Sequence, residues 1–124
     1  MDYQQHLAQA LLALGEDDEA RALLQLREAE AQAARIDPEG PRVAEVLNYA
    51  AQVQARGGRP AEARAALERV VAIWQRFPGL SEGLEGYYLQ LMGLCTQLGD
   101  NAAAEAWQAR ARSSKPQGDV RPWR

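Results

Sequence analysis

The sequence predicts an all-α protein made of three consecutive helical hairpins. Apolar residues make up 47% of the 124 residues, many of them alanines, and aromatic residues only 6%. This composition favours helices that pack closely over alanine, because strands prefer β-branched and aromatic residues. A glycine followed five residues later by alanine recurs in three polar turns. The first two of these glycines are slightly further apart in the sequence than the last two. These pairs are Gly15 and Ala20, Gly58 and Ala63, and Gly99 and Ala104. A repeat of this length accommodates one hairpin and its connection.

The first hairpin is predicted over residues 1–37. Its first helix runs from about Asp2 to Leu14, where a glycine follows. Its second helix begins after a run of acidic residues, which favour the positive N-terminal end of a helix. It stops near Arg35, before the Asp-Pro pair at 37–38. The side chains expected in the core are Tyr3, Leu7, Ala10, Leu11 and Leu14, then Ala20, Leu23, Leu24, Ala31 and Ala34.

The second hairpin is predicted over residues 41–79. Pro41 and Pro60 open its two helices, because proline is well tolerated in the first turn of a helix. Gly57-Gly58 ends the first of these helices and Phe77-Pro78-Gly79 ends the second. The expected core residues are Val43, Val46, Leu47, Ala50, Ala51 and Val53, then Ala63, Ala66, Leu67, Val70, Val71, Trp74 and Phe77.

The third hairpin is predicted over residues 81–112, with Ser81 and Asn101 as the caps of its helices. The expected inward residues are Leu84, Tyr87, Tyr88, Leu91, Leu94, Cys95 and Leu98, then Ala104, Trp107 and Ala111. Residues 113–124 are predicted to form a short, disordered, flexible C-terminal tail, because the Lys-Pro-Gln-Gly run at 115–118 cannot continue a helix.

Charge and hydropathy restrict the class of partner. The net charge is −3 and the pI about 5.2, which argues against a nucleic-acid binder. No apolar run approaches the length of a membrane span and no signal peptide is visible, so we expect no membrane contact. A single cysteine excludes an internal disulfide. We therefore expect a cytoplasmic protein, and the excess of arginine over lysine with abundant alanine suggests a bacterial source.

No residue constellation indicates catalysis, a cofactor or a metal. His6 is the only histidine and has no cysteine or acidic pair at a metal-ligand spacing. Cys95 lies on an apolar helix face without a base nearby in sequence. The acidic run at 16–19 lacks the spaced oxygen ligands of a calcium loop. We therefore expect that the protein is not an enzyme.

The stretch from Leu47 to Ile73 resembles a tetratricopeptide (TPR) repeat, in the roughly 42-residue variety of kinesin light chains and many bacterial regulatory proteins. The matching residues are Leu47, Asn48, Ala50, Ala51, Gly58, Arg59, Glu62, Ala63, Arg69, Ala72 and Ile73. The first repeat matches at Leu7, Ala8, Leu11, Gly15, Glu19, Ala20 and Leu24, and the third at Tyr88, Leu91, Gly99, Asp100 and Ala104. The resemblance covers about residues 1–112.

This resemblance implies a right-handed superhelical solenoid whose concave groove is lined by the first helix of each hairpin. The groove residues that it implies are Gln5, Gln9, Leu12, Glu45, Asn48, Gln52, Arg56, Leu89, Gln90 and Gln97, with Gly86 and Gly93 beside them. Many of these are amides, which can donate to and accept from a peptide backbone. Glycines in a helix cost about 1 kcal/mol each relative to alanine. They indicate either a close approach by a neighbouring helix or a peptide, or a loose helix.

The function expected from this resemblance is that of a scaffold or adaptor that binds a peptide or helix of a partner protein in the groove. The carboxylate-binding TPR subclass is disfavoured, because Gln5 and Gln9 stand where that subclass has lysine and asparagine. Secretion chaperones with three TPR repeats remain an open possibility. The alternative is a self-associating module, such as a homodimer through the C-terminal repeat, or a fragment of a longer TPR protein.

Overall fold

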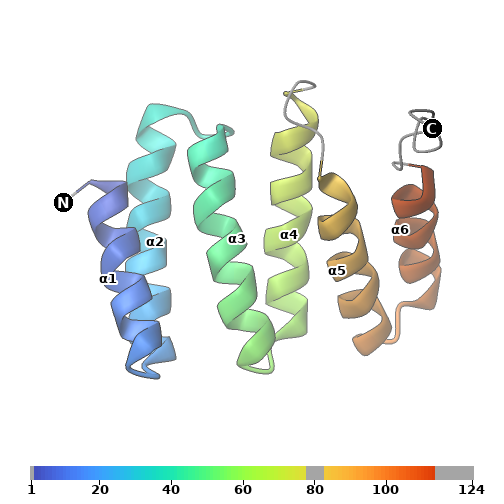
Figure 1. Ribbon diagram of the computed structural model, residues 1–124, viewed down its shortest axis with the longest axis horizontal. Coiled ribbons are helices and arrows are strands. Elements are labelled where there is room, and N and C mark those ends of the chain that lie inside the picture. Colours follow the sequence, from blue (N-terminus) through green and yellow to red (C-terminus); the bar gives the residue numbers. More distant parts are fainter. Residues whose placement is uncertain (1, 78–82, 114–124) are drawn as a thin grey trace, which may run out of the picture.

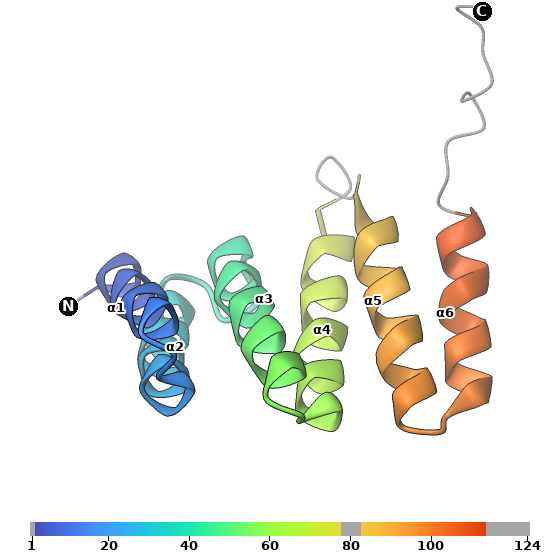
Figure 2. The ribbon, with the colours of Figure 1, turned by 60° about the horizontal axis from the view of Figure 1, so that its bottom comes forward.

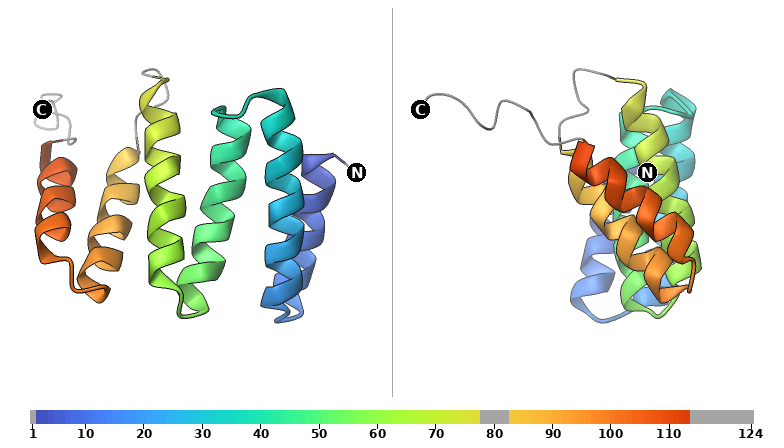
Figure 3. Two further views of the ribbon diagram at one scale, coloured as in Figure 1. Left: turned by 180° about the vertical axis from the view of Figure 1, so that it is seen from behind. Right: turned by 90° about the vertical axis from the view of Figure 1, so that its right-hand side faces the viewer.

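The computed structural model describes residues 2–77 and 83–113, and they form an all-α solenoid (Figure 1). Its helices are α1 (Tyr3–Gly15), α2 (Glu19–Ile36), α3 (Pro41–Arg56), α4 (Pro60–Gln75), α5 (Leu84–Gln97) and α6 (Asn101–Ser113). Each helix contacts its neighbours in the chain, most extensively within the pairs α1–α2, α3–α4 and α5–α6. The three pairs stand in a row (Figures 2 and 3). The predicted fold class is confirmed.

The helix starts follow the expected chemistry, with one correction. The Asp2 carboxylate accepts a hydrogen bond from the Gln5 backbone N–H, and the Gln5 side chain accepts one from the Asp2 backbone N–H. Pro41 and Pro60 are the first residues of α3 and α4. The prediction of Asn101 as a cap is wrong: Asp100 caps α6, because its carboxylate accepts from the Ala103 backbone N–H at 3.2 Å. The predicted cap Ser81 lies outside the described residues.

The three hairpin turns share one geometry, which corrects the alignment of the repeats. Asp17, Gly58 and Gly99 all have a left-handed backbone, with φ of 59°, 76° and 78°. In each turn the next backbone N–H donates to a carbonyl five residues earlier, at 2.8, 2.8 and 2.9 Å. This is a Schellman motif, the usual way to end a helix at a left-handed residue. Asp17, and not Gly15, is therefore the counterpart of Gly58, and the intervals between the three left-handed residues are equal.

The corrected alignment also changes the buried face of α2. The residues buried in α2 are Ala22, Leu26, Ala29 and Ala33. The predicted stripe began at Ala20, which is exposed. A shift of two residues turns a side chain by roughly 200° around a helix of 3.6 residues per turn. For this reason Leu24, predicted in the core, is 58% exposed. Leu11, also predicted in the core, is 44% exposed.

The core depends on small residues at helix contacts. Ala10, Ala29, Ala44, Ala63 and other alanines are buried, and larger side chains such as Leu67, Ile73 and Leu91 fill the space between the helix pairs. As expected, alanine at these contacts allows the helices to approach closely.

Ion pairs also join successive hairpins. Arg69 on α4 donates to Glu30 on α2 at 2.9 Å. Arg64 on α4 donates to Asp100, at the start of α6, at 3.1 Å. Both pairs are partly exposed to solvent, so they orient the hairpins more than they stabilise them.

The left-handed turns provide a test of the corrected alignment. We expect Asp17→Gly to raise the free energy of unfolding by about 0.5–1 kcal/mol, because glycine adopts a left-handed backbone without a Cβ penalty. Gly58→Ala should lower it by about 1 kcal/mol for the opposite reason. Urea denaturation measures both changes in the free energy of unfolding. Gly15→Ala is the control, and a loss of stability in that variant as large as in Gly58→Ala would contradict the correction.

Asp100 makes stability depend on acid pH. The hydrogen bond from the Ala103 backbone N–H, and next the Arg64 guanidinium, lower the pKa of the Asp100 carboxyl below its usual 3.8. The stability contributed by this carboxylate is therefore present above pH 3.8 and is lost as the pH falls through the lower folded-state pKa. Near pH 6, Asp100→Asn should have a lower melting temperature than the wild type. Between pH 6 and pH 2 its melting temperature should fall by less than that of the wild type, and thermal melts over this range measure both. Glu105→Gln, on the exposed surface of the same helix, is the matched control.

Candidate functional site

The candidate site is a groove between α3 and α5, with α4 behind it. Figure 1 shows α4 standing between these two helices in the row. Cavities lie along the groove, two of which overlap near the start of α3 and α5 and have volumes of about 450 and 540 Å³. A third, of about 310 Å³, lies further along both helices. Volumes of about 300–1,000 Å³ are typical of ligand sites.

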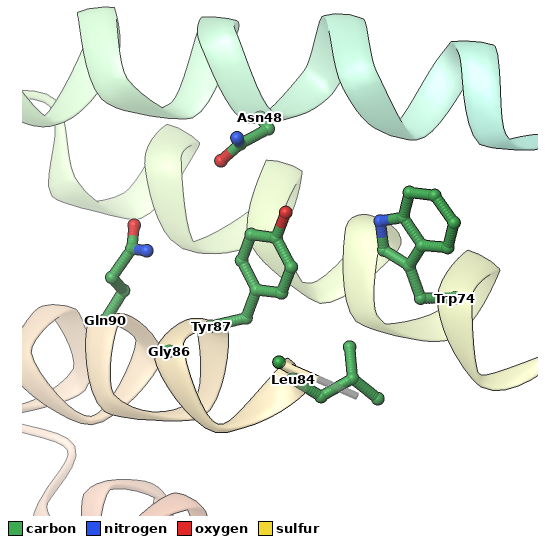
Figure 4. Close-up of a pocket in the computed structure, with 7 residues that line it drawn as sticks. Asn48, Trp74, Leu84, Gly86, Tyr87 and Gln90 are labelled. Carbon is green, nitrogen blue, oxygen red and sulfur yellow. The ribbon is translucent and has the colours of Figure 1, made fainter. Parts of the chain in front are cut away.

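We call the two overlapping cavities the aromatic hollow. Its lining residues are Pro41, Arg42, Glu45, Asn48, Tyr49, Gln52, Trp74, Gly83, Leu84, Gly86, Tyr87 and Gln90. Figure 4 shows Asn48 across the hollow from Tyr87 and Gln90, with Trp74 beside Tyr87. Trp74, Tyr49 and Tyr87 are half-buried and pack against the core with their rings. Burial raises the pKa of the Tyr87 hydroxyl, so this group stays neutral and can donate a hydrogen bond at physiological pH.

Asn48 carries the one side-chain atom that is buried and without a hydrogen-bond partner among the described residues. This atom is Oδ1, which is almost completely shielded from solvent, and Asn48 is one of the residues that line the aromatic hollow. An unsatisfied buried acceptor costs about 1–3 kcal/mol. A donor in the hollow would remove that cost if the Asn48 side chain turned to bring Oδ1 to the surface of the hollow.

We call the third cavity the glycine hollow. Its lining residues are Ala51, Gln52, Ala55, Leu67, Leu89, Gln90, Gly93, Leu94 and Gln97. The Gln52 Nε2 donates to the Gln90 Oε1 at 2.8 Å, from α3 to α5. These two residues line both hollows, so their amide bridge marks the border between them.

Gly86 and Gly93 keep the α5 wall of the groove flat. A Cβ on either residue would meet nothing within 4 Å, apart from its own helix and chain neighbours. No neighbouring helix therefore requires glycine at these positions. Of the explanations offered by the sequence, a bound peptide and a loose helix remain.

The structure brings six of the predicted groove residues together around the two hollows. These residues are Glu45, Asn48, Gln52, Leu89, Gln90 and Gln97, with Gly86 and Gly93 beside them. Arg56 is placed elsewhere. It lines a small cavity with Leu14, Asp17, Glu19 and Val53, against the turn of the first hairpin.

Gln5, Gln9 and Leu12, which the sequence predicts in the groove, line neither of the two hollows. When the repeats are aligned on their left-handed residues, these three correspond to Val46, Ala50 and Val53 of α3. These α3 residues pack against the first hairpin, in a cluster with Leu26 and Ala29 of α2. In the described chain no earlier hairpin covers the same positions of α1, and all three are exposed there. They form the N-terminal end face of the solenoid.

Sequence reasoning also missed the three rings of the aromatic hollow. The helical periodicity predicts that Tyr87 faces inward and that Trp74 packs in the core, and it gives no role to Tyr49. Trp74 and Tyr87 do pack against the core, but each also lines the hollow. Aromatic side chains with a polar tip often bridge an apolar and a wet environment. The sequence periodicity of a helix does not reveal such a double role.

The other chemically versatile residues lie away from the groove. His6 Nδ1 lies 2.8 Å from Gln25 Oε1, between α1 and α2. Cys95 is fully buried, and burial raises the pKa of its thiol. Within residues 2–77 and 83–113, no group of three or more His, Cys, Asp or Glu side chains is arranged to hold a metal ion. None of the described helices is long and apolar enough to cross a membrane.

These features define a TPR-like helical repeat fold. No protein-family model matches the sequence, and no curated protein shows significant similarity. Among solved structures, BtubC (BKLC) from P. vanneervenii is similar with a TM-score of 0.81 and 24% identity. The match covers 97% of this chain, which spans about half (49%) of BtubC. The TPR domain of Arabidopsis FLU is similar with a TM-score of 0.75 and 18% identity, over 90% of this chain and 92% of that domain. The predicted resemblance to TPR repeats is confirmed at the level of the fold.

The two open glycines give a prediction. We expect Gly86→Ala and Gly93→Ala each to raise the free energy of unfolding by up to about 1 kcal/mol, because alanine favours a helix and meets no obstacle. Chemical denaturation measures both changes. Gly99→Ala, at a left-handed position, should destabilise instead. A loss of stability in Gly86→Ala or Gly93→Ala would show that the fold itself needs these glycines.

Proposed function

We propose that the protein is a scaffold that binds an extended segment of a partner protein in the groove between α3 and α5. TPR-like repeats generally mediate interactions between proteins. The observation that carries the proposal is the buried Asn48 Oδ1 without a partner, because a backbone N–H of a bound segment would satisfy it. The proposal places the protein among non-enzymatic scaffolds, as is typical of this fold.

The groove favours an extended segment over a helix. A helix satisfies its own backbone hydrogen bonds, whereas an extended segment offers free N–H and C=O groups. Asn48, Gln52, Gln90 and Gln97 supply amides that can pair with those groups. Gly86 and Gly93 leave room for a backbone to approach α5. The charged residues Arg42 and Glu45 have opposite signs, so the groove does not select for a highly charged ligand.

Self-association through the C-terminal repeat has less support. Leu26 of α2 and Leu67 of α4 pack against the hairpin that follows each of them. The equivalent residue of α6 is Gln108, which is exposed. Glu105 and Arg112 are exposed on the same helix. The end face of α6 in the described chain is therefore polar at the position that would dock a further hairpin. We also propose a cytoplasmic, reducing environment, consistent with a buried and unpaired Cys95.

A displayed library of random peptides would test the proposed function. Peptides selected on the wild-type protein should bind Asn48→Leu about tenfold more weakly, since one hydrogen bond to a buried acceptor is worth about 1–1.5 kcal/mol. Leucine is compatible with the fold at this position, because Leu7 and Leu89 occupy it in the other two repeats. Calorimetry measures the affinities.

Gln9→Ala is the matched control, because it changes an exposed amide on the end face of α1. It should leave the affinity unchanged. If Asn48→Leu binds as tightly as wild type while Gln9→Ala weakens binding, the binding surface is the end face and the groove proposal fails.

A further inference from the structure

The aromatic hollow has the chemistry of a site for a tryptophan side chain. Its walls hold Tyr49, Trp74 and Tyr87, and Leu84 adds apolar surface. Aromatic rings attract one another beyond the burial of their area. The unpaired Asn48 Oδ1 on the same wall can accept from an indole N–H. A tryptophan thus matches both the rings and the orphan acceptor.

The chain itself supplies such a side chain. Of its eight aromatic residues, seven are described, and each is buried in the core or packs against it. The eighth is Trp123, in the sequence Arg121-Pro122-Trp123-Arg124. Proline-rich segments also dock in aromatic-lined grooves, and arginine stacks on aromatic rings. The last four residues of the sequence therefore combine three side-chain types that suit an aromatic site.

The segment after α6 is long enough to reach the hollow. Figure 1 shows that α6 ends at the same end of the solenoid at which α4 ends and α5 begins, where Trp74 and Tyr87 lie. Trp123 is ten residues beyond Ser113, and ten extended residues span at most about 33–36 Å. Packed helix axes are about 8–10 Å apart, so the groove beyond α5 lies about 16–20 Å from α6. The extended segment is therefore longer than the distance from α6 to the groove, so it can pass over the end of α5.

Charge also favours the contact. Three of the 14 basic residues and one of the 17 acidic residues follow Ser113, so residues 114–124 carry a net charge of +2. Residues 1–113 carry the balance, a net charge of −5. At the rim of the hollow, Glu45 can pair with Arg121 or Arg124, and Arg42 with Asp119. Opposite net charges attract the segment to the solenoid before the specific contacts form.

We propose that the aromatic hollow binds this chain's own segment 114–124, with the Trp123 ring against Trp74 and Tyr87. The bound segment covers the part of the groove next to Asn48. A partner segment must displace it, which makes the tail an internal competitor for the groove. This consequence rests on the proposed function, whereas the contact itself does not.

The contact can be tested in the full-length protein by NMR, without any partner. The probes are the indole N–H of Trp74, assigned with Trp74→Phe, and the side-chain amide of Asn48. Both signals should shift in Trp123→Ala and stay in place in the control Val120→Ala. The Trp107 indole signal should not move in either variant, because that ring stacks on Tyr88 and does not line the hollow. A synthetic peptide of residues 114–124, added to Trp123→Ala, should restore the wild-type positions of both signals.

Two outcomes would overturn the proposal. Unchanged Trp74 and Asn48 signals in Trp123→Ala would show that the tail does not occupy the hollow. Shifts that grow with protein concentration in the wild type would show that the tail of a second copy binds instead. Neither outcome bears on the peptide-binding test with Asn48→Leu, so failure of this inference and failure of the proposed function can be told apart.

Discussion

The left-handed turn inside each hairpin is the constraint on which the rest of the solenoid depends. In all three turns a left-handed residue and one backbone hydrogen bond close the first helix, and the second helix begins two residues later. The geometry fixes which face of the second helix is buried. Ala22, Ala63 and Ala104 therefore occupy the same buried place, the fourth residue of their helices, at equal intervals along the chain. Because each turn is equivalent, the two helices of every hairpin are joined in the same way.

Because the turns are equivalent, positions in the three hairpins can be compared, and the proposed function draws on the differences between them. Val46 and Val53 of α3 pack against the preceding hairpin, whereas Gln5 and Leu12 of α1 are exposed at an end of the described solenoid. Asn48 stands at a position that leucine occupies in the other two repeats. A polar side chain with a buried, unpaired acceptor does not stabilise the core, and this is the observation behind the proposed binding role of Asn48.

The groove and the core share residues, which links stability to binding. Trp74 and Tyr87 pack against the core on one side and line the aromatic hollow on the other. Their rings are thus held in place before a ligand arrives, and a preorganised site loses less conformational entropy on binding. The amide bridge between Gln52 and Gln90 is different, because both side chains are exposed and can exchange their mutual hydrogen bond for one to a ligand.

Sequence alone predicted the helical class, the two proline-started helices and six residues that line the two hollows. Proline, glycine and the 3.6-residue period act within a few residues, so they can be read without the fold. Tertiary structure decided which residue of the first turn is left-handed. Asp17 takes a conformation in which glycine is usual, so a nearby glycine misled the alignment by two residues. Only the packing of hairpin on hairpin could assign Gln5, Gln9 and Leu12 to an end face and bring Trp74 beside Tyr87, because burial between repeats depends on contacts far apart in the chain.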